Sequence, residues 1–176
     1  MDYYLVVYSS NEDEDFGTVT LPRDWDYYIF RSGNYVDEVE IPVLKMSKGR
    51  FEDYQSSLLI LCSEKLKNIV ELNKSPDDII QWFSVKIDSE EYGILNYFIL
   101  HFPNVPDVLN REKTIFNTYD PEYVIKPHFD LMKVRKYHIF TYYTESVHTW
   151  VVSEKMKSEI QKAGITGIDF APLSVS

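Results

Sequence analysis

Two serines in this chain, Ser63 and Ser153, are each followed by Glu-Lys. A serine beside a lysine can act as a nucleophile, with the lysine amine as the base that takes its proton. Here the lysine is only two positions further on, so on a helix the two side chains would point in different directions. The position three residues after each serine is held by Leu66 and Met156. A serine hydroxyl also caps a helix by accepting a hydrogen bond from a free amide of the first turn. The sequence therefore predicts that both serines are structural helix caps.

The histidines and the cysteine have no spacing that is typical of a metal site. His101, His128, His138 and His148 form no pair at ligand spacing. Cys62 lies in an apolar run, which predicts a buried and unreactive thiol. The six glycines include no Gly-x-Gly arrangement that would hold a phosphate. We therefore expect no catalytic residue, no metal and no cofactor.

Acidic residues are concentrated in the first third of the chain. Residues 1–53 contain 12 acidic and 5 basic residues, a net charge of −7 out of −10 for all 176 residues. This charge distribution argues against direct binding to nucleic acid or to an anionic membrane, because both need clusters of Lys and Arg. It is compatible with a basic protein partner.

Two acidic stretches are candidates for partner contact. Residues 12–15 are all acidic but lack the spacing of a calcium loop, and they fit either a solvated loop or a contact with a partner. Residues 24–28 interleave three aromatic residues with two aspartates, a mixture typical of protein interfaces. The same aromatic residues also fit one face of a β-sheet, and both interpretations stay open.

The cellular compartment is predicted from the targeting and disulfide signals that the sequence lacks. A single cysteine excludes an intrachain disulfide, and the N-terminus lacks the basic start and apolar run of a signal peptide. No stretch approaches the roughly 18 apolar residues that span a bilayer. We expect a cytoplasmic protein.

A pattern of apolar run, Ser-Glu-Lys and helical stretch occurs twice, at residues 58–70 and 148–160. Each copy then returns to an apolar-aromatic run, at residues 80–85 and 168–173. A short continuous apolar run is typical of a strand that is buried on both faces. The pattern thus predicts two strand–helix–strand units, with Gly164 as the left-handed residue that ends the second helix.

The predicted fold is α+β, mostly antiparallel sheet, with two similar strand–helix–strand units and few helices. Residues 88–91 are expected to be the turn of a hairpin, and Pro42 should confine its strand to a sheet edge. The length predicts one domain over residues 1–176, with residues 1–50 as an acidic N-terminal lobe. Strands are predicted at residues 3–8, 38–44, 58–62, 80–87, 92–102, 123–134, 137–143, 147–152 and 168–173.

The end of the chain carries a distinctive pair of segments. Residues 151–157 read VVSEKMK, and residues 163–173 read AGITGIDFAPL. Together they resemble the C-terminal signature of a bacterial immunity protein family, number eleven of its series, which belongs to polymorphic toxin systems. Residues 61–66 and 80–83 are similar to the family's earlier copy of this element. The resemblance covers residues 51–176, and residues 1–50 match only loosely.

This resemblance implies an antitoxin that protects a bacterium by binding a cognate toxin rather than by catalysis. The acidic balance of the chain agrees with this resemblance, because an acidic inhibitor is compatible with a basic toxin domain. The residues alone also allow a small hydrolase that uses scattered carboxylates and histidines, or a scaffolding protein unrelated to toxins. The surface expected to bind the partner comprises Glu12, Asp13, Glu14, Asp15, Asp24, Trp25, Asp26, Tyr27, Asp37 and Glu38.

Overall fold

A computed structural model describes residues 2–9, 15–55, 57–120, 123–143 and 149–176. The described chain is mostly sheet with few helices, so the α+β class is confirmed. Its helical elements are η1 (Tyr27–Phe30, a 3-10 helix), α1 (Glu64–Asn73), α2 (Leu131–Val134) and α3 (Glu154–Lys162). Its strands are β1 (Tyr3–Tyr8), β2 (Val19–Thr20), β3 (Leu44–Met46), β4 (Tyr54–Gln55), β5 (Leu61–Cys62), β6 (Gln81–Ser89), β7 (Gly93–His101), β8 (Ile115–Phe116), β9 (Val124–Lys126), β10 (His128–Phe129), β11 (Ile139–Phe140), β12 (Val151–Ser153) and β13 (Ile168–Val175).

The first sheet brings the two ends of the chain together, with the strand order β10-β13-β1-β12-β11. β1 lies at its centre and pairs antiparallel with both β12 and β13. β10 joins β13 in parallel at the edge. The N-terminal strand is thus held between two strands from the last 26 residues of the chain.

The second sheet has the order β2-β3-β6-β7-β5-β4 and is built around a long hairpin. β6 and β7 pair antiparallel over their whole length, from Gln81 opposite His101 to Ser89 opposite Gly93. The predicted hairpin is therefore confirmed. A further small sheet pairs β8 with β9.

The strands before and after each long helix do not pair with each other. β5 and β6 flank α1 in sequence, but β7 lies between them in the sheet. β12 and β13 flank α3, but β1 lies between them. In each case an antiparallel strand from another part of the chain lies between the two flanking strands. The expectation of two similar strand–helix–strand units stays a prediction.

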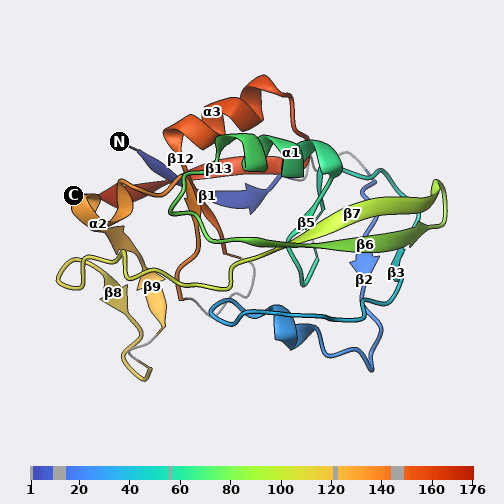
Figure 1. The fold of residues 1–176 in the computed structure, drawn as a ribbon, viewed down its shortest axis with the longest axis horizontal. Coiled ribbons are helices and arrows are strands. Elements are labelled where there is room, and N and C mark those ends of the chain that lie inside the picture. The colour runs from blue at the N-terminus through green and yellow to red at the C-terminus, as the bar shows by residue number, and fades with distance from the viewer. Residues whose placement is uncertain (1, 10–14, 56, 121–122, 144–148) are drawn as a thin grey trace.

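Helices α1 and α3 pack together against both sheets (Figure 1). Their apolar faces, with Leu66 and Val70 on α1 and Met156 and Ile160 on α3, are fully buried. The core that contains them also takes side chains from β1, β5, β7, β11 and β12. Because one core spans both sheets, each helix contributes to holding the sheets together.

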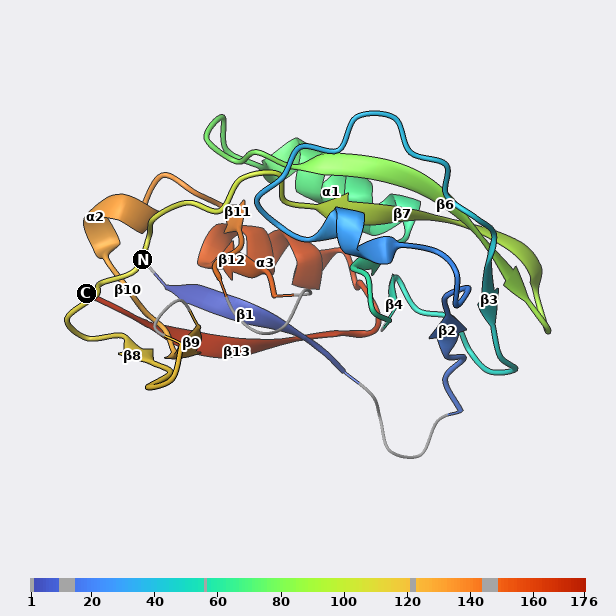
Figure 2. The same ribbon diagram turned by 90° about the horizontal axis from the view of Figure 1, so that it is seen from below.

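The opposite face of the second sheet is covered by an irregular segment, residues 21–43, which includes η1. Figure 1 shows α1 above β6 and β7 and η1 below them, and Figure 2 shows the same segment from below. The core on this face is formed by Phe30 of η1, Leu44 and Met46 of β3, and apolar residues of β6 and β7. Alternate residues along each strand face opposite sides, so β6 and β7 supply both cores.

Several predicted strands are shorter than expected. The edge strand predicted at residues 38–44 is wrong in extent and in position. The strand β3 begins only at Leu44, because Pro42 has no amide to donate to a ladder, and β3 lies between β2 and β6 rather than at an edge. The continuous strand predicted over residues 123–134 is wrong. Pro127 separates β9 from β10, and the Asp130 carboxylate then caps α2 by accepting bonds from the amides of Met132 and Lys133.

Candidate partner-binding surface

The two serines that suggested nucleophilic chemistry lie at the starts of helices. The Ser63 hydroxyl accepts a hydrogen bond from the Leu66 amide at 3.2 Å and donates to a carboxylate oxygen of Asp53 at 2.6 Å. The Ser153 hydroxyl accepts from the Met156 amide at 3.3 Å, and this serine is completely buried. Both hydroxyls are occupied by structural bonds, so neither is placed as an exposed nucleophile.

A serine, a histidine and an aspartate meet at the start of α3, but not in the geometry of a catalytic triad. Nδ1 of His138 lies 3.1 Å from the Ser153 hydroxyl. The Asp78 carboxylate accepts from the backbone amide of His138, at 3.0 Å, and from that of Ser75, at 2.6 Å. A triad carboxylate orients the base by accepting from its ring nitrogen. Burial raises the pKa of Asp78 and lowers the pKa of His138, which disfavours the charged form of each. The arrangement therefore ties the loop after α1 to β11 and β12.

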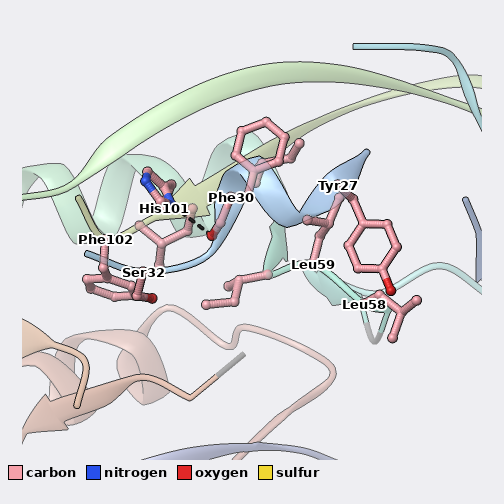
Figure 3. A pocket seen from close by; sticks show the side chains of 10 residues that line it. Tyr27, Phe30, Ser32, Leu58, Leu59, His101 and Phe102 are labelled. Atoms are coloured by element: carbon pink, nitrogen blue, oxygen red, sulfur yellow. Dashed lines mark hydrogen bonds between the residues drawn. The ribbon is translucent and has the colours of Figure 1, made fainter. Parts of the chain in front are cut away.

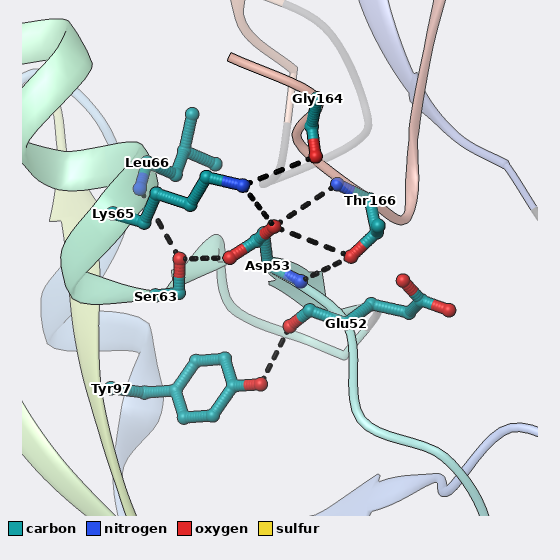
Figure 4. A network of polar contacts seen from close by, with 8 residues as sticks. All are labelled: Glu52, Asp53, Ser63, Lys65, Leu66, Tyr97, Gly164 and Thr166. Carbon is teal, nitrogen blue, oxygen red and sulfur yellow. Dashed lines mark hydrogen bonds and ion pairs between the residues drawn. The ribbon is translucent and has the colours of Figure 1, made fainter.

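A second polar cluster links the start of α1 to the loop after α3 (Figure 4). We call it the Asp53 network, and it consists of Asp53, Ser63, Lys65, Gly164 and Thr166. Besides its bond from Ser63, the Asp53 carboxylate accepts from the Thr166 amide at 3.2 Å. The Lys65 ammonium lies 3.8 Å from the same carboxylate and donates to the Gly164 carbonyl at 3.2 Å. The loop that begins at Gly164 thereby joins the two sheets.

Gly167 lets this loop approach the backbone of the second sheet. Its φ of +77° is a conformation that L side chains rarely adopt. A Cβ at this position would collide with the carbonyl oxygen of Tyr54 and would lie 2.7 Å from Cβ of Glu52. In the same loop, Gly164 has a φ of +63° but open space around its missing Cβ. These contacts give the segment at residues 163–167 a structural role.

The segment over residues 21–43 carries most of the predicted contact residues, and we call it the acidic segment. It contains five acidic residues and two arginines. Phe30 is buried, and further apolar side chains of the segment pack half-buried against the sheet. The five carboxylates are exposed. Apolar packing inward therefore leaves the negative charge facing outward.

Three contacts hold the acidic segment on the sheet. The buried His101 ring places Nδ1 3.0 Å from the Phe30 carbonyl oxygen and Nε2 2.7 Å from that of Asn34. The Gln81 side chain bonds both backbone groups of Val36, at 2.8 and 3.1 Å. The Gly33 amide donates to the carbonyl of Phe102 at 2.9 Å. Sequence reasoning missed these anchors, because each joins residues 45 or more positions apart.

The structure brings six of the predicted contact residues onto the acidic segment. Asp24, Trp25, Asp26 and Tyr27 lie in the turn before η1 and in η1 itself, whereas Asp37 and Glu38 lie in the stretch that follows. The 3-10 helix shows that the alternative of a β-strand at these aromatic residues is wrong. The remaining four are placed differently. Asp15 is exposed before β2, and Glu12, Asp13 and Glu14 lie outside the described residues.

The Asp26 carboxylate has a local structural role. It caps η1 by accepting a bond from the Tyr28 amide at 3.1 Å. The rings of Tyr27 and Tyr28 stack with their centroids 4.6 Å apart, and Tyr28 is 62% exposed. The cap thus presents an aromatic pair at the surface beside a carboxylate.

The other carboxylates of the acidic segment have no cation beside them among the described residues. The ion pairs found among the described residues all lie outside the acidic segment, such as those of Glu71 with Lys74 and of Asp107 with Lys133. Asp24, Asp37 and Glu38 belong to none of them. Their charge is therefore available to act on a molecule outside the chain.

A hollow opens in the acidic segment between its first and last turns. It has a volume of about 260 Å³ and is lined by Pro22, Asp24, Trp25, Glu40 and Pro42. Glu40 is a residue that sequence reasoning missed, since only the folded segment brings it near Asp24. Two carboxylates, an indole and two prolines give this hollow a chemistry suited to an organic cation.

A second cavity, behind η1, is too small for a ligand (Figure 3). It lies among residues of η1, of β7 and of the stretch that precedes β5, and its volume of about 10 Å³ corresponds to roughly one water molecule. The labelled side chains, including Tyr27, Leu59 and His101, surround it. This space is part of the packing that supports the acidic segment.

The described residues include neither a group of potential metal ligands nor a helix that could cross a membrane. No three His, Cys, Asp or Glu side chains there are grouped so that they could hold a metal ion. Cys62 is buried, and burial raises the pKa of its thiol. None of the described helices has the length and apolar character needed to cross a membrane.

The fold and surface define an α+β protein whose distinctive feature is an acidic, aromatic face laid over a sheet. The chain belongs to the Imm11 immunity protein family, whose model matches residues 12–175. The match is wider than the resemblance over residues 51–176, and it includes the acidic segment. Membership implies an inhibitor that binds a toxin partner and does not act by catalysis. A search of the curated proteins finds no match.

Proposed function

We propose that this protein is a cytoplasmic antitoxin that protects the producing bacterium by binding and blocking the toxin domain of a polymorphic toxin. It acts as a stoichiometric inhibitor and not as an enzyme. Family membership supports the immunity role. The observation that carries the binding surface is the exposed, unpaired carboxylates of the acidic segment.

The partner is a basic toxin domain. Charges that face solvent without partners act over about 10 Å at moderate salt and steer an oppositely charged molecule. The stacked pair Tyr27 and Tyr28 lies on the same segment, and aromatic residues anchor protein interfaces once water is excluded. Carboxylates would thus set the rate of association, and the aromatic pair would slow dissociation.

The whole chain is proposed to act as one domain. Two similar strand–helix–strand units, β5-α1-β6 and β12-α3-β13, would form the scaffold, and the acidic segment would lie on one of them. The covered sheet supports this division of roles, because His101 and Gln81 fix the acidic segment from below. A scaffold of this kind allows the surface to change while the core is kept.

Co-expression with the toxin domain encoded beside this chain tests the function. Growth should be restored only when this protein is present, and a purified mixture should form a stable complex. A toxin that kills equally with and without the protein would contradict the immunity role for that pair.

A variant in which four carboxylates are neutralised tests whether the acidic segment is the docking surface. The variant Asp24→Asn, Asp37→Asn, Glu38→Gln, Glu40→Gln keeps the Asp26 cap and should lower the association rate about 10-fold or more at low salt. A matched control neutralises four exposed carboxylates elsewhere, Glu64, Glu90, Glu112 and Asp169. The control should change the rate much less. Equal effects of the two variants in stopped-flow measurements would show that the acidic segment is not the docking surface.

A further inference from the structure

The hollow of the acidic segment combines three features that favour one kind of ligand. Asp24 and Glu40 supply negative charge, and neither forms an ion pair with any described residue. Trp25 supplies an indole, which packs edge-on against Phe30 with ring centroids 6.0 Å apart. Pro22 and Pro42 supply apolar walls without side-chain hydrogen-bond groups. A cation with a flat, weakly hydrated surface matches all three.

We propose that this hollow receives an arginine side chain of the partner. The inference rests on the proposed function and adds the chemistry of one contact. The guanidinium group is planar, stacks on aromatic rings and is more weakly hydrated than an ammonium, so apolar walls cost it less. Its five donors also allow it to bond both carboxylates at once.

The size and position of the hollow agree with a single side chain. Its volume of about 260 Å³ lies below the roughly 300–1,000 Å³ that is typical of pockets for small-molecule ligands. It is open to solvent on the same segment as the exposed Tyr28, so a side chain from a docked protein can enter it. The chain's own Arg23 does not line it and forms no ion pair with the described residues. The site is therefore free for a cation from outside.

The backbone of the acidic segment holds the hollow in shape before a partner arrives. The Trp25 amide donates to the Pro22 carbonyl at 3.2 Å, which closes the turn that carries Asp24. The anchors at His101 and Gln81 fix the middle of the segment. A preformed site loses less conformational freedom on binding, which favours binding of a group that fits the hollow.

A titration without the toxin tests the chemistry of the hollow. The probe is N-acetyl-arginine amide, followed by NMR at the Trp25 indole resonance, which a Trp25→Phe variant identifies. We expect saturable binding with a dissociation constant of roughly millimolar at low salt. The citrulline analogue has the same shape without the charge and should bind at least 10-fold more weakly. Equal shifts with citrulline, or equal affinity for N-acetyl-lysine amide, would overturn the proposal.

Two double variants distinguish binding by the carboxylates of the hollow from attraction by the overall negative charge of the acidic segment. Asp24→Asn with Glu40→Gln removes both carboxylates of the hollow and should abolish saturable arginine binding. Asp37→Asn with Glu38→Gln removes the same charge from the same segment, outside the hollow, and should weaken binding no more than about twofold, as expected for screened exposed charges. Equal losses of arginine affinity in the two variants would show that the arginine is attracted only by the general negative charge of the segment, and this result would overturn the proposal.

The same pair of variants applied to the toxin complex distinguishes this inference from the proposed function. The hollow variant should weaken toxin binding at least 10-fold more than its control. If the wild-type protein binds the toxin and both variants bind it equally well, the hollow is not an arginine receptor in the complex, although the immunity role stands. If the wild-type protein binds no toxin while arginine binding remains, the proposed function fails on its own.

Discussion

The Asp53 network and the acidic segment use carboxylates in opposite ways. Asp53 is largely buried and accepts hydrogen bonds from Ser63 and Thr166 beside Lys65. The carboxylates of the acidic segment are exposed, and apart from Asp26 they have no such partners among the described residues. A bonded carboxylate contributes to the folded state, whereas an exposed one mainly adds repulsion and long-range field. Substitutions in the network should therefore lower stability, and substitutions in the segment should lower the affinity for a partner.

The largest expected effect comes from Gly167, which lets the network's loop touch the second sheet. Gly167→Ala should lower the free energy of unfolding by about 3 kcal/mol or more, because it adds a backbone collision to an unfavourable φ. The matched change Gly164→Ala meets no atom and should cost about 1 kcal/mol. Denaturant unfolding measures both, and equal losses would contradict the docking role of Gly167.

The next effect compares one carboxylate from each region. Asp53→Ala should cost about 2 kcal/mol, because it leaves Ser63 and Thr166 without their acceptor and Lys65 without its ion-pair partner. Asp24→Ala should stay within about 0.5 kcal/mol of the wild type, as expected for an exposed residue. Urea titrations at neutral pH give both values. A loss of stability at Asp24 as large as that at Asp53 would contradict the different roles assigned to the two carboxylates.

Alkaline pH probes the core beside the network. Burial raises the pKa of Tyr54 to about 12. A raised pKa gives stability that is present below the unfolded value near 10 and is lost as the pH rises through the folded value. Relative to Tyr54→Phe, the wild type should lose about 1.4 kcal/mol by pH 11. Parallel stability curves for the two proteins between pH 9 and 11 would show that Tyr54 ionises freely.

The two caps should each contribute about 1 kcal/mol. Ser63→Ala and Ser153→Ala both remove the acceptor for a first-turn amide. Toxin binding should stay unchanged in both variants, because neither serine lies on the acidic segment. Thermal unfolding and a binding titration measure the two effects, and a loss of binding with intact stability would move the contact surface to the helix starts.

The smallest expected effect on stability is that of the fourfold variant of Asp24, Asp37, Glu38 and Glu40. Its free energy of unfolding should stay within about 0.5 kcal/mol of the wild type or rise slightly, because repulsion between like charges is relieved. The same change should give the largest loss of association rate. A protein that unfolds on neutralisation would show that these charges have an unseen structural partner.

Local patterns were enough to predict part of this molecule. The turn residues between β6 and β7 predicted the hairpin, and the Ser-Glu-Lys pattern located the starts of α1 and α3, because both signals act between near neighbours. The segment at residues 163–167 indicated the family before its structural role was visible.

The remaining features depend on contacts between distant residues. The aromatic run at Tyr27–Phe30 fitted a strand equally well, and the structure shows a 3-10 helix that packs Phe30 beside Phe83 and His101. His101 has no metal-ligand spacing in the sequence, whereas in the fold its ring holds the acidic segment. Glu40 joins the hollow only because the segment folds back on itself. No local pattern reports such pairings.

The central place of β1 has a consequence for how the protein is made. Tyr3 pairs with Ser153 and with Leu173, so β1 has no partner until about 150 further residues have been synthesised. At typical rates of synthesis this takes roughly 8 to 30 s. During that time β1 exposes both edges and a row of aromatic and branched side chains. On the function proposed above, protection would lag behind translation by this interval, so finished molecules would have to be present before the toxin arrives.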